Sequence, residues 1–430
     1  MLLETIRRLD PFLRSNALLV VVLGYLVMPY PPRPGLFTLS ALIAFLFLVY
    51  ILVTRPQAQL DTAPLLLLTA FAAYDFLFLF REGFSFPLLR AYSFGLMTFL
   101  ATAVYTTREG LRRLSVGLAL WLGATVVVCG AQFIGGDAFY LPLYFQYFGG
   151  AKASGLFNFR LITTPVGLNF AKTQLGGQLA FIVPFLLYVA AARPRRGRGT
   201  WAGVAVSAMI LALSFSRAAW AGVFGALLVA MMFRYPGYLK AVGVFAVVFG
   251  LTLAAVALDP REHYCVEKNC ATSIYKNKAI VAQAVHASSD VSARTRVVLV
   301  AAGLRTAAEN PFGGGPGFFT AEYDQHKANV LSGVDSRPNL APHNTYVQVL
   351  AEKGVPGLAL FALLLGTILF KLFRQARTRA DCYPPAVLAG LAGILIYGLF
   401  HEALPDRMIW IALGMAVASY QRASLGTGIE

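Results

Sequence analysis

The residues best suited to chemistry lie in the polar stretch 337–346, whose sequence is RPNLAPHNTY. Its two prolines stiffen the approach and favour extended backbone before each of them. Asn344 or Thr345 can then cap a helix that begins in the apolar run that follows. An imidazole exchanges a proton near neutral pH, so His343 can activate a hydroxyl nucleophile. We predict a catalytic His343 at the mouth of this helix. The alternative is an interfacial histidine that only hydrogen-bonds a loop.

Arginines form the second group of candidates. Arg217 follows Ser214-Phe215-Ser216 between two apolar runs, and Arg294, Arg296 and Arg305 lie on an expected helix. At about 100° per residue, Arg294 and Arg305 share one face of that helix and Arg296 points elsewhere. A guanidinium can grip a diphosphate through a planar fork of donors, which lysine does poorly. We therefore predict an anion site. A snorkelling Arg217 and a solvated basic helix face are the alternatives.

Other polar residues are weaker candidates. Arg160 and Lys172 lie in an earlier loop and can add anion contacts. His401 begins the turn 401–407, which can support the site or be a salt-bridged structural turn through Glu402, Asp406 and Arg407. Carboxylates elsewhere are scattered, so the sequence predicts no metal site, and it indicates no cofactor.

The elements that must position these residues are membrane helices. The chain has 430 residues, of which 58% are hydrophobic and only 13% charged. Repeated apolar runs of spanning length predict an all-α polytopic membrane protein with about twelve transmembrane helices. The expected spans are 16–30, 36–53, 62–80, 88–105, 113–134, 173–192, 200–214, 217–233, 239–258, 345–370, 384–400 and 407–420.

The loops predict the orientation of these spans. Arg and Lys concentrate on one set of connections, including the run 193–198, which places both termini in the cytoplasm. Residues 1–258 then hold the first nine spans, with an outer loop at about 135–172. Residues 259–344 form a large, helical periplasmic loop, and 345–430 hold the last three spans. Within the large loop, a helix is expected at 292–309 and a shorter one at about 318–331, separated by a glycine-rich turn that cannot continue a helix.

Charge and cysteine content bound the partners. The net charge of +16 fits cytoplasmic loops and an anionic lipid or pyrophosphate substrate. No nucleic-acid-binding motif is present, so nucleic acid is not an expected partner. Cys265 and Cys270 share the large loop and are either a disulfide or two free thiols.

Three stretches together resemble the O-antigen ligase and polymerase superfamily. Ser214-Phe215-Ser216-Arg217 is similar to its Ser-x-Ser-Arg turn. The helix through Arg296 that ends in 309–318, ENPFGGGPGF, resembles its Asn-Pro-x-Gly-x-Gly-Pro-Gly signature. The stretch 342–357, PHNTYVQVLAEKGVPG, resembles its His-Asn…Glu-x-Gly-x-x-Gly signature. Gly314 departs from the pattern, because many members carry a bulkier residue there.

The resemblance implies a glycosyltransferase of the GT-C type in the bacterial inner membrane, with its active site on the periplasmic side. It would move a glycan from undecaprenyl diphosphate to a hydroxyl acceptor without a metal, with inversion if the displacement is direct. Arg217 and Arg296, with Arg294 as the other choice, would hold the diphosphate. His343 would activate the acceptor, with Asn344 as a further contact.

The resemblance favours an O-antigen ligase, which uses a sugar of lipid A-core as acceptor in lipopolysaccharide biosynthesis. An O-antigen polymerase and a protein O-oligosaccharyltransferase are alternatives within the superfamily. A transporter of lipid-linked glycans is an alternative of another class. It would bury charges at mid-membrane between repeated halves, whereas this sequence gathers its candidates at one surface.

Overall fold

The computed structural model describes the chain through most of its apolar runs. The described residues are 12, 15–23, 26, 46, 49–50, 61–82, 86–135, 172–192, 198–214, 216–233, 237–258, 291–323, 341–378, 381–404 and 407–424. The first two expected spans lie mostly outside these ranges. So do the stretch 136–171 with Arg160, and the part of the large loop that holds Cys265 and Cys270.

Helices occupy the other ten expected spans. They are α3 (Thr62–Glu82), α4 (Phe86–Tyr105), α5 (Arg108–Gly135), α8 (Lys172–Ala192), α9 (Arg198–Leu213), α10 (Arg217–Met231), α11 (Tyr238–Leu258), α15 (Thr345–Arg377), α16 (Tyr383–Tyr397) and α17 (Arg407–Ser424). Helices α5, α8, α11 and α15 contain stretches long and apolar enough to cross a membrane, and the other six hold shorter apolar stretches. The described residues contain no strand. This is the architecture of a polytopic helical membrane protein.

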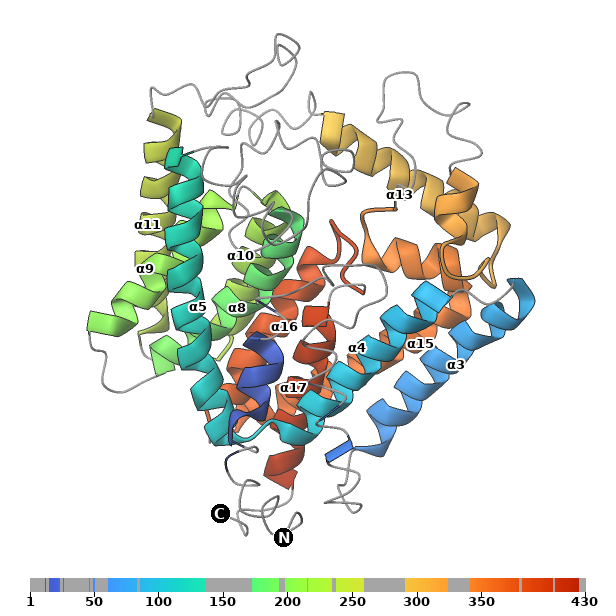
Figure 1. Ribbon diagram of the computed structural model, residues 1–430, viewed down its shortest axis with the longest axis horizontal. Coiled ribbons are helices and arrows are strands. Elements are labelled where there is room, and N and C mark those ends of the chain that lie inside the picture. Colours follow the sequence, from blue (N-terminus) through green and yellow to red (C-terminus); the bar gives the residue numbers. More distant parts are fainter. Residues whose placement is uncertain are drawn as a thin grey trace.

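The centre of the bundle is built on close contacts between small residues. A Cβ atom at Gly222 of α10 would lie 2.6 Å from the Gly393 carbonyl oxygen of α16, and Gly393 in turn faces Ala180 of α8. A Cβ atom at Gly414 of α17 would lie 2.6 Å from the Phe99 carbonyl oxygen of α4. Small residues let helix backbones approach closely where no hydrophobic effect drives their association. Helix α16 is therefore central, between α8, α10, α15 and α17 (Figure 1).

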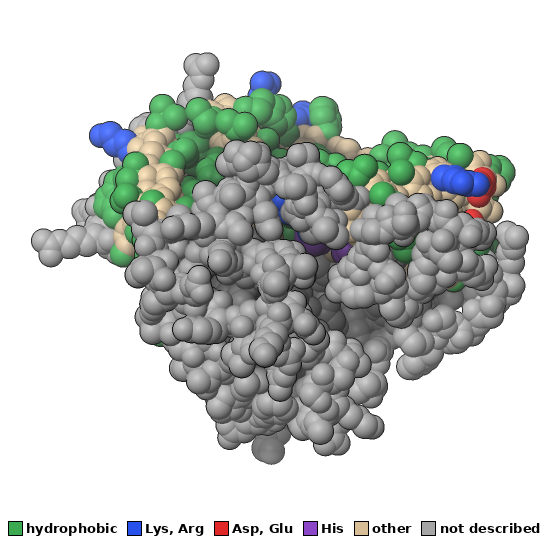
Figure 2. Space-filling view, turned by 90° about the horizontal axis from the view of Figure 1, so that it is seen from above, with side chains coloured by type: hydrophobic (Ala, Val, Ile, Leu, Met, Phe, Trp, Pro, Cys, Tyr) green, Lys and Arg blue, Asp and Glu red, His purple; other side chains and the backbone are tan. Residues whose placement is uncertain are grey.

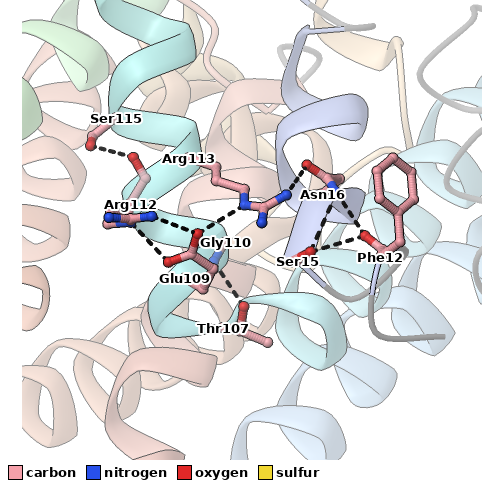
Figure 3. A network of polar contacts seen from close by, with 9 residues as sticks. All are labelled: Phe12, Ser15, Asn16, Thr107, Glu109, Gly110, Arg112, Arg113 and Ser115. Carbon is pink, nitrogen blue, oxygen red and sulfur yellow. Dashed lines mark hydrogen bonds and ion pairs between the residues drawn. The ribbon is translucent and has the colours of Figure 1, made fainter. Parts of the chain in front are cut away.

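One end of the bundle carries many basic residues. The end where α5 and α16 begin and α15 finishes, called the basic end here, carries Arg108, Arg112, Arg113, Lys371, Arg374 and Arg377. Glu109 pairs with Arg112 and Arg113 at 2.8 and 2.9 Å, and Arg113 donates to Asn16 at 2.7 Å (Figure 3). Arg108 reaches Asp381 at 3.6 Å. Basic residues at helix ends on one side of the bundle are typical of the cytoplasmic side of a membrane protein.

Helix α13 (Val291–Glu309) confirms the helix expected in the large loop. It lies across the end at which α15 begins, called the site end here (Figure 1). Leu299 of α13 forms a small apolar cluster with Ala351 of α15 and with Phe319 and Tyr323, which follow the glycine-rich turn. A Cβ atom at Gly303 would meet a methyl group of Val347 at 2.5 Å, so the two helices touch closely there. Residues 318–323 are helical, as expected for the start of the next short helix.

The glycine-rich turn after α13 fits into a kink in α15. Gly354 interrupts α15 with a φ of 64°, and Gly313 in the turn has a φ of 81°. The Val355 N–H donates to the Pro311 carbonyl oxygen at 2.8 Å, and the Gly315 N–H donates to the Glu352 carbonyl oxygen at 2.8 Å. The expected span at 345–370 is therefore two helical pieces rather than one continuous helix. We call this contact between 311–315 and 352–355 the glycine interlock.

Helix α3 holds the interlock from its other side. Lys353 is fully buried and forms an ion pair with Asp75 of α3. The Lys353 ammonium also lies 5.0 Å from the centre of the Phe71 ring. The Tyr74 hydroxyl donates to the Phe312 carbonyl oxygen at 2.8 Å. A buried charge requires a partner, so this ion pair fixes α3 against the kink.

Candidate active site

The start of α15 is held by a dense set of hydrogen bonds. The Asn344 side-chain oxygen accepts from the N–H groups of Tyr346 and Val347 at 2.9 and 3.0 Å, which confirms Asn344 as the helix cap. Its amide nitrogen donates to the Leu399 carbonyl oxygen at 2.9 Å. The Thr345 hydroxyl donates to the His401 carbonyl oxygen at 2.8 Å and accepts from the Ala403 N–H at 2.7 Å. The turn between α16 and α17 is thereby fixed against the first turn of α15.

His343 has an unusual backbone conformation. Its φ is 51°, and it is the one non-glycine residue of the described chain with a positive φ. This conformation costs roughly 1–2 kcal/mol for a residue with a Cβ atom, so the surrounding contacts must stabilise it. The His343 N–H donates to Glu402 Oε1 at 2.8 Å. The ring atom Nδ1 lies 3.1 Å from that same oxygen. One carboxylate oxygen therefore holds the backbone of His343 and lies next to its ring.

The electrostatics of this pair favour one protonation pattern. Burial alone would raise the pKa of the Glu402 carboxyl, but the contact with His343 and the neighbouring His401 hold that pKa below its ordinary value of 4.5. Glu402 is then a carboxylate at neutral pH, next to His343 Nδ1. A neutral imidazole has one ring nitrogen that can accept a proton from a hydroxyl group. A carboxylate that orients an imidazole in this way is the arrangement of a general base.

Arg296 reaches this pair from α13. It shares a helix face with Leu299 and Gly303, three and seven residues later, and both of these pack toward α15. Its Nη2 atom lies 3.4 Å from His401 Nε2. The ring centres of His343 and His401 are 5.5 Å apart. We call Arg296, His343, His401 and Glu402 the histidine cluster. Figure 2 views the molecule from the site end, and the described histidine side chains lie near the middle of this view, beside a Lys or Arg side chain.

Arg217 lies at the same end of the bundle, on a different helix. It is the first residue of α10, and Gly222 five residues later packs on Gly393 and Tyr397 near the end of α16. The serines before it have structural roles. The Ser214 hydroxyl donates to the Leu211 carbonyl oxygen at 2.7 Å, and the Ser216 hydroxyl caps α10 by accepting from the Ala219 N–H at 3.3 Å. The hydroxyl groups of Ser214 and Ser216 are therefore used within the turn, and Arg217 is its remaining candidate for chemistry.

The remaining sequence candidates have other placements. Arg305 forms an exposed ion pair with Glu309 at 2.8 Å. Arg294 lies in the first turn of α13, and its side chain is outside the described part of the structure. Lys172 is the first residue of α8, and Gly176 of that helix lies against Ser216, which puts Lys172 at the site end. Arg160 lies outside the described residues.

Three members of the histidine cluster are close enough to share an ion. The ligand atoms of His343, His401 and Glu402 all lie within 4.8 Å of one another, and no other such group occurs in the described part of the chain. No sequence pattern indicates this group, because His343 is far along the chain from His401 and Glu402. Nitrogen and carboxylate donors suit Zn²⁺. However, the Arg296 guanidinium lies at His401 Nε2 and already brings a positive charge to that nitrogen.

Sequence reasoning missed two acidic residues. It left Glu402 between support of the site and a salt-bridged structural turn, and the structure shows Glu402 in contact with His343. It did not consider Asp75, although a carboxylate inside an apolar run signals a buried partner. The partner, Lys353, lies 278 residues away, and no local pattern links the two.

A comparison with known protein families finds a match that covers part of this end of the molecule. Residues 202–362 match the family model described as O-antigen ligase. The matched region runs from α9 to the second half of α15. It includes Arg217, Arg296 and His343, whereas His401 and Glu402 lie beyond it. The match confirms the resemblance to the O-antigen ligase and polymerase superfamily, whose members are glycosyltransferase-like enzymes. No curated protein matches the chain.

Proposed function

We propose that the protein is an O-antigen ligase of the bacterial inner membrane. It transfers O-antigen polysaccharide from undecaprenyl diphosphate to a sugar hydroxyl of lipid A-core. The observation that carries this proposal is the contact of His343 with Glu402 near the Arg296 guanidinium. His343 and Arg296 lie within the region that the family model matches, and Glu402 lies beyond it. A base next to a group that can hold a leaving anion is what this displacement requires.

The proposal gives each residue a role. His343 Nε2 takes the proton from the acceptor hydroxyl, while Glu402 holds the ring and stabilises the charge that it gains. Arg296, and Arg217 from the start of α10, bind the diphosphate and stabilise it as it leaves. Arg294 and Lys172 are secondary contacts. The attacking oxygen enters as the diphosphate departs, so the transfer inverts the configuration at the anomeric carbon.

The charge distribution supports a periplasmic site. The basic end collects the arginines and lysines described above, as expected for the cytoplasmic side. The histidine cluster lies at the opposite end, where α13 packs against the start of α15. Lipid-linked O-antigen and lipid A-core would then both meet the cluster from the outer leaflet.

The first test of this proposal uses His343→Ala. With purified protein and a lipid-linked glycan, we expect transfer to fall by roughly 10²–10⁴-fold or more, because the base is removed. Binding of the donor should persist, which separates an enzyme from a transporter. A variant with a normal transfer rate would exclude His343 as the base.

The second test identifies the acceptor. The same lipid-linked donor is offered with lipid A-core, and separately with a second lipid-linked glycan. A ligase extends only the lipid A-core, with one product per acceptor. Elongation of the second lipid-linked glycan instead would show an O-antigen polymerase.

A further inference from the structure

One face of α15 changes from apolar to basic as the helix reaches the basic end. Leu363 and Phe370 lie on this face and are 57% and 63% exposed. The last turn of the helix continues the same face with two exposed arginines, Arg374 and Arg377. In a membrane protein, an exposed apolar stripe on a spanning helix faces the acyl chains of the lipid. The two arginines then lie at the level of the lipid headgroups.

The acidic side chains that the structure describes at this end already have basic partners. The pairs are Asp61 with Lys371, Glu109 with Arg112 and Arg113, and Asp381 with Arg108. None of these carboxylates pairs with Arg374 or Arg377, and the described residues offer these two arginines no other acidic partner. Side chains three residues apart on a helix are neighbours, so the two like charges repel each other. An anion from outside the chain would relieve this repulsion.

Aromatic rings hold both guanidinium groups without neutralising their charge. The central carbon of the Arg374 guanidinium lies 5.9 Å from the centre of the Phe370 ring. That of Arg377 lies 4.8 Å from the centre of the Phe373 ring. A guanidinium that stacks on an aromatic face keeps its planar fork of N–H donors. A group that is held before its ligand arrives binds with a smaller entropic cost.

We propose that the end of α15 is a binding site for an anionic phospholipid. Arg374 and Arg377 donate to oxygen atoms of the lipid phosphate, for which the guanidinium fork is well suited. Phe370 lies against the adjoining part of the acyl chains. The site is at the basic end, away from the histidine cluster, and beyond residue 362, where the family match stops. It does not depend on the proposed function.

A simpler account gives these arginines no ligand. Basic residues orient a membrane protein during insertion, and cations are favourable in the last turn of a helix. If these were their only roles, the folded protein would bind anionic and zwitterionic lipids equally well at this end. Lipid selectivity of the purified protein therefore separates the two accounts.

The experiment measures lipid binding to the purified full-length protein in detergent by native mass spectrometry. Phosphatidylglycerol is the probe, and phosphatidylcholine is the zwitterionic comparison. We expect the wild-type protein to bind phosphatidylglycerol more tightly. Arg374→Gln with Arg377→Gln should weaken that binding roughly 25-fold, because each basic residue near an anionic surface contributes about a 5-fold factor.

The matched control removes two charges from the same end of the bundle but leaves α15 unchanged. Arg108→Gln with Arg112→Gln replaces two arginines whose side chains are 71% and 67% exposed. Its affinity for phosphatidylglycerol should stay within about 2-fold of wild type, because exposed charges away from the site contribute little. An equal loss of affinity in both double variants would show that overall charge attracts the lipid, and would overturn the proposal.

Two further results would also overturn it. Unchanged binding in Arg374→Gln with Arg377→Gln would remove the arginines from the site. Displacement of the lipid by an equal concentration of glycerol phosphate, which lacks acyl chains, would show a site for a soluble anion instead. If the double variant does not elute as a folded protein in size-exclusion chromatography, the single variant Arg374→Gln is used, with an expected loss of about 5-fold.

Discussion

The glycine interlock and the histidine cluster both involve α15, but different kinds of contact hold them. In the interlock, backbone meets backbone: a Cβ atom at Gly354 would lie 2.6 Å from the Gly313 nitrogen. In the cluster, side chains from α13, from the residue just before the cap of α15 and from the turn after α16 converge on one another. The interlock thus depends on the absence of side chains, and the cluster on their exact chemical type. Changes in the first should break the fold, whereas changes in the second should break activity within an intact fold.

The largest effect is expected from Gly354→Ala. The new Cβ atom would overlap the turn at Pro311–Gly313, and alanine would also have to adopt a φ of 64°. Strain in φ alone costs roughly 1–2 kcal/mol, and the overlap forces the two backbones apart. We expect little folded protein after purification in detergent, as measured by size-exclusion chromatography. Gly366→Ala, in the same helix with nothing within 4 Å, is the control and should behave as wild type.

The ion pair that supports the interlock should give the next largest effect. Lys353→Met leaves the Asp75 carboxylate buried without its partner, which typically destabilises a protein by roughly 3–5 kcal/mol. Thermal unfolding should show a clear drop in melting temperature. The double variant Lys353→Met with Asp75→Leu removes both charges and should recover part of the loss. A double variant as unstable as the single one would show that the charge pair is not what holds α3 to the kink.

These regions also mark how far the sequence alone could lead. Long apolar runs and loop charge predict the helices, because a membrane span needs a continuous apolar length. The cap at Asn344 and the helix stop before the glycine turn follow from local backbone preferences. The kink at Gly354 could not be placed, because Gly354 sits inside an apolar run that reads as one helix. Its reason is a turn some 40 residues earlier in the chain, at Pro311–Gly315.

The histidine cluster could also be predicted only in part from the sequence. The sequence could offer His343 as a candidate base and Arg296 as a candidate anion contact, because their residue types carry that chemistry. Glu402 lies 59 residues after His343, and no spacing rule joins them. The nearby arginines differ only in helix face: Arg296 turns toward α15, and Arg305 pairs with Glu309 in solvent. The packing of α13 against α15 decides which arginine contacts the histidines. That packing cannot be read from the sequence.

Glu402→Gln should have a smaller effect on the fold and a clear effect on activity. The amide keeps an oxygen for the His343 N–H but removes the charge that orients and stabilises the imidazole. We expect kcat to fall roughly 10–100-fold, as for other groups that orient a functional histidine. The melting temperature at neutral pH should change little compared with that of Lys353→Met. An unchanged kcat would mean that His343 does not need the carboxylate.

The smallest expected effect is the pH dependence of stability that Glu402 contributes. Because its pKa in the folded protein lies below the ordinary value of 4.5, the folded state favours the carboxylate. The stabilisation relative to Glu402→Gln should then be fully present above pH 4.5 and disappear as the pH falls through the lowered pKa. Its size should be about 1 kcal/mol, because both side chains are partly exposed. Melting temperatures of the two proteins, measured between neutral and acidic pH, should converge toward the acid end. Curves that stay parallel throughout would show that the contact with His343 does not depend on the charge of Glu402.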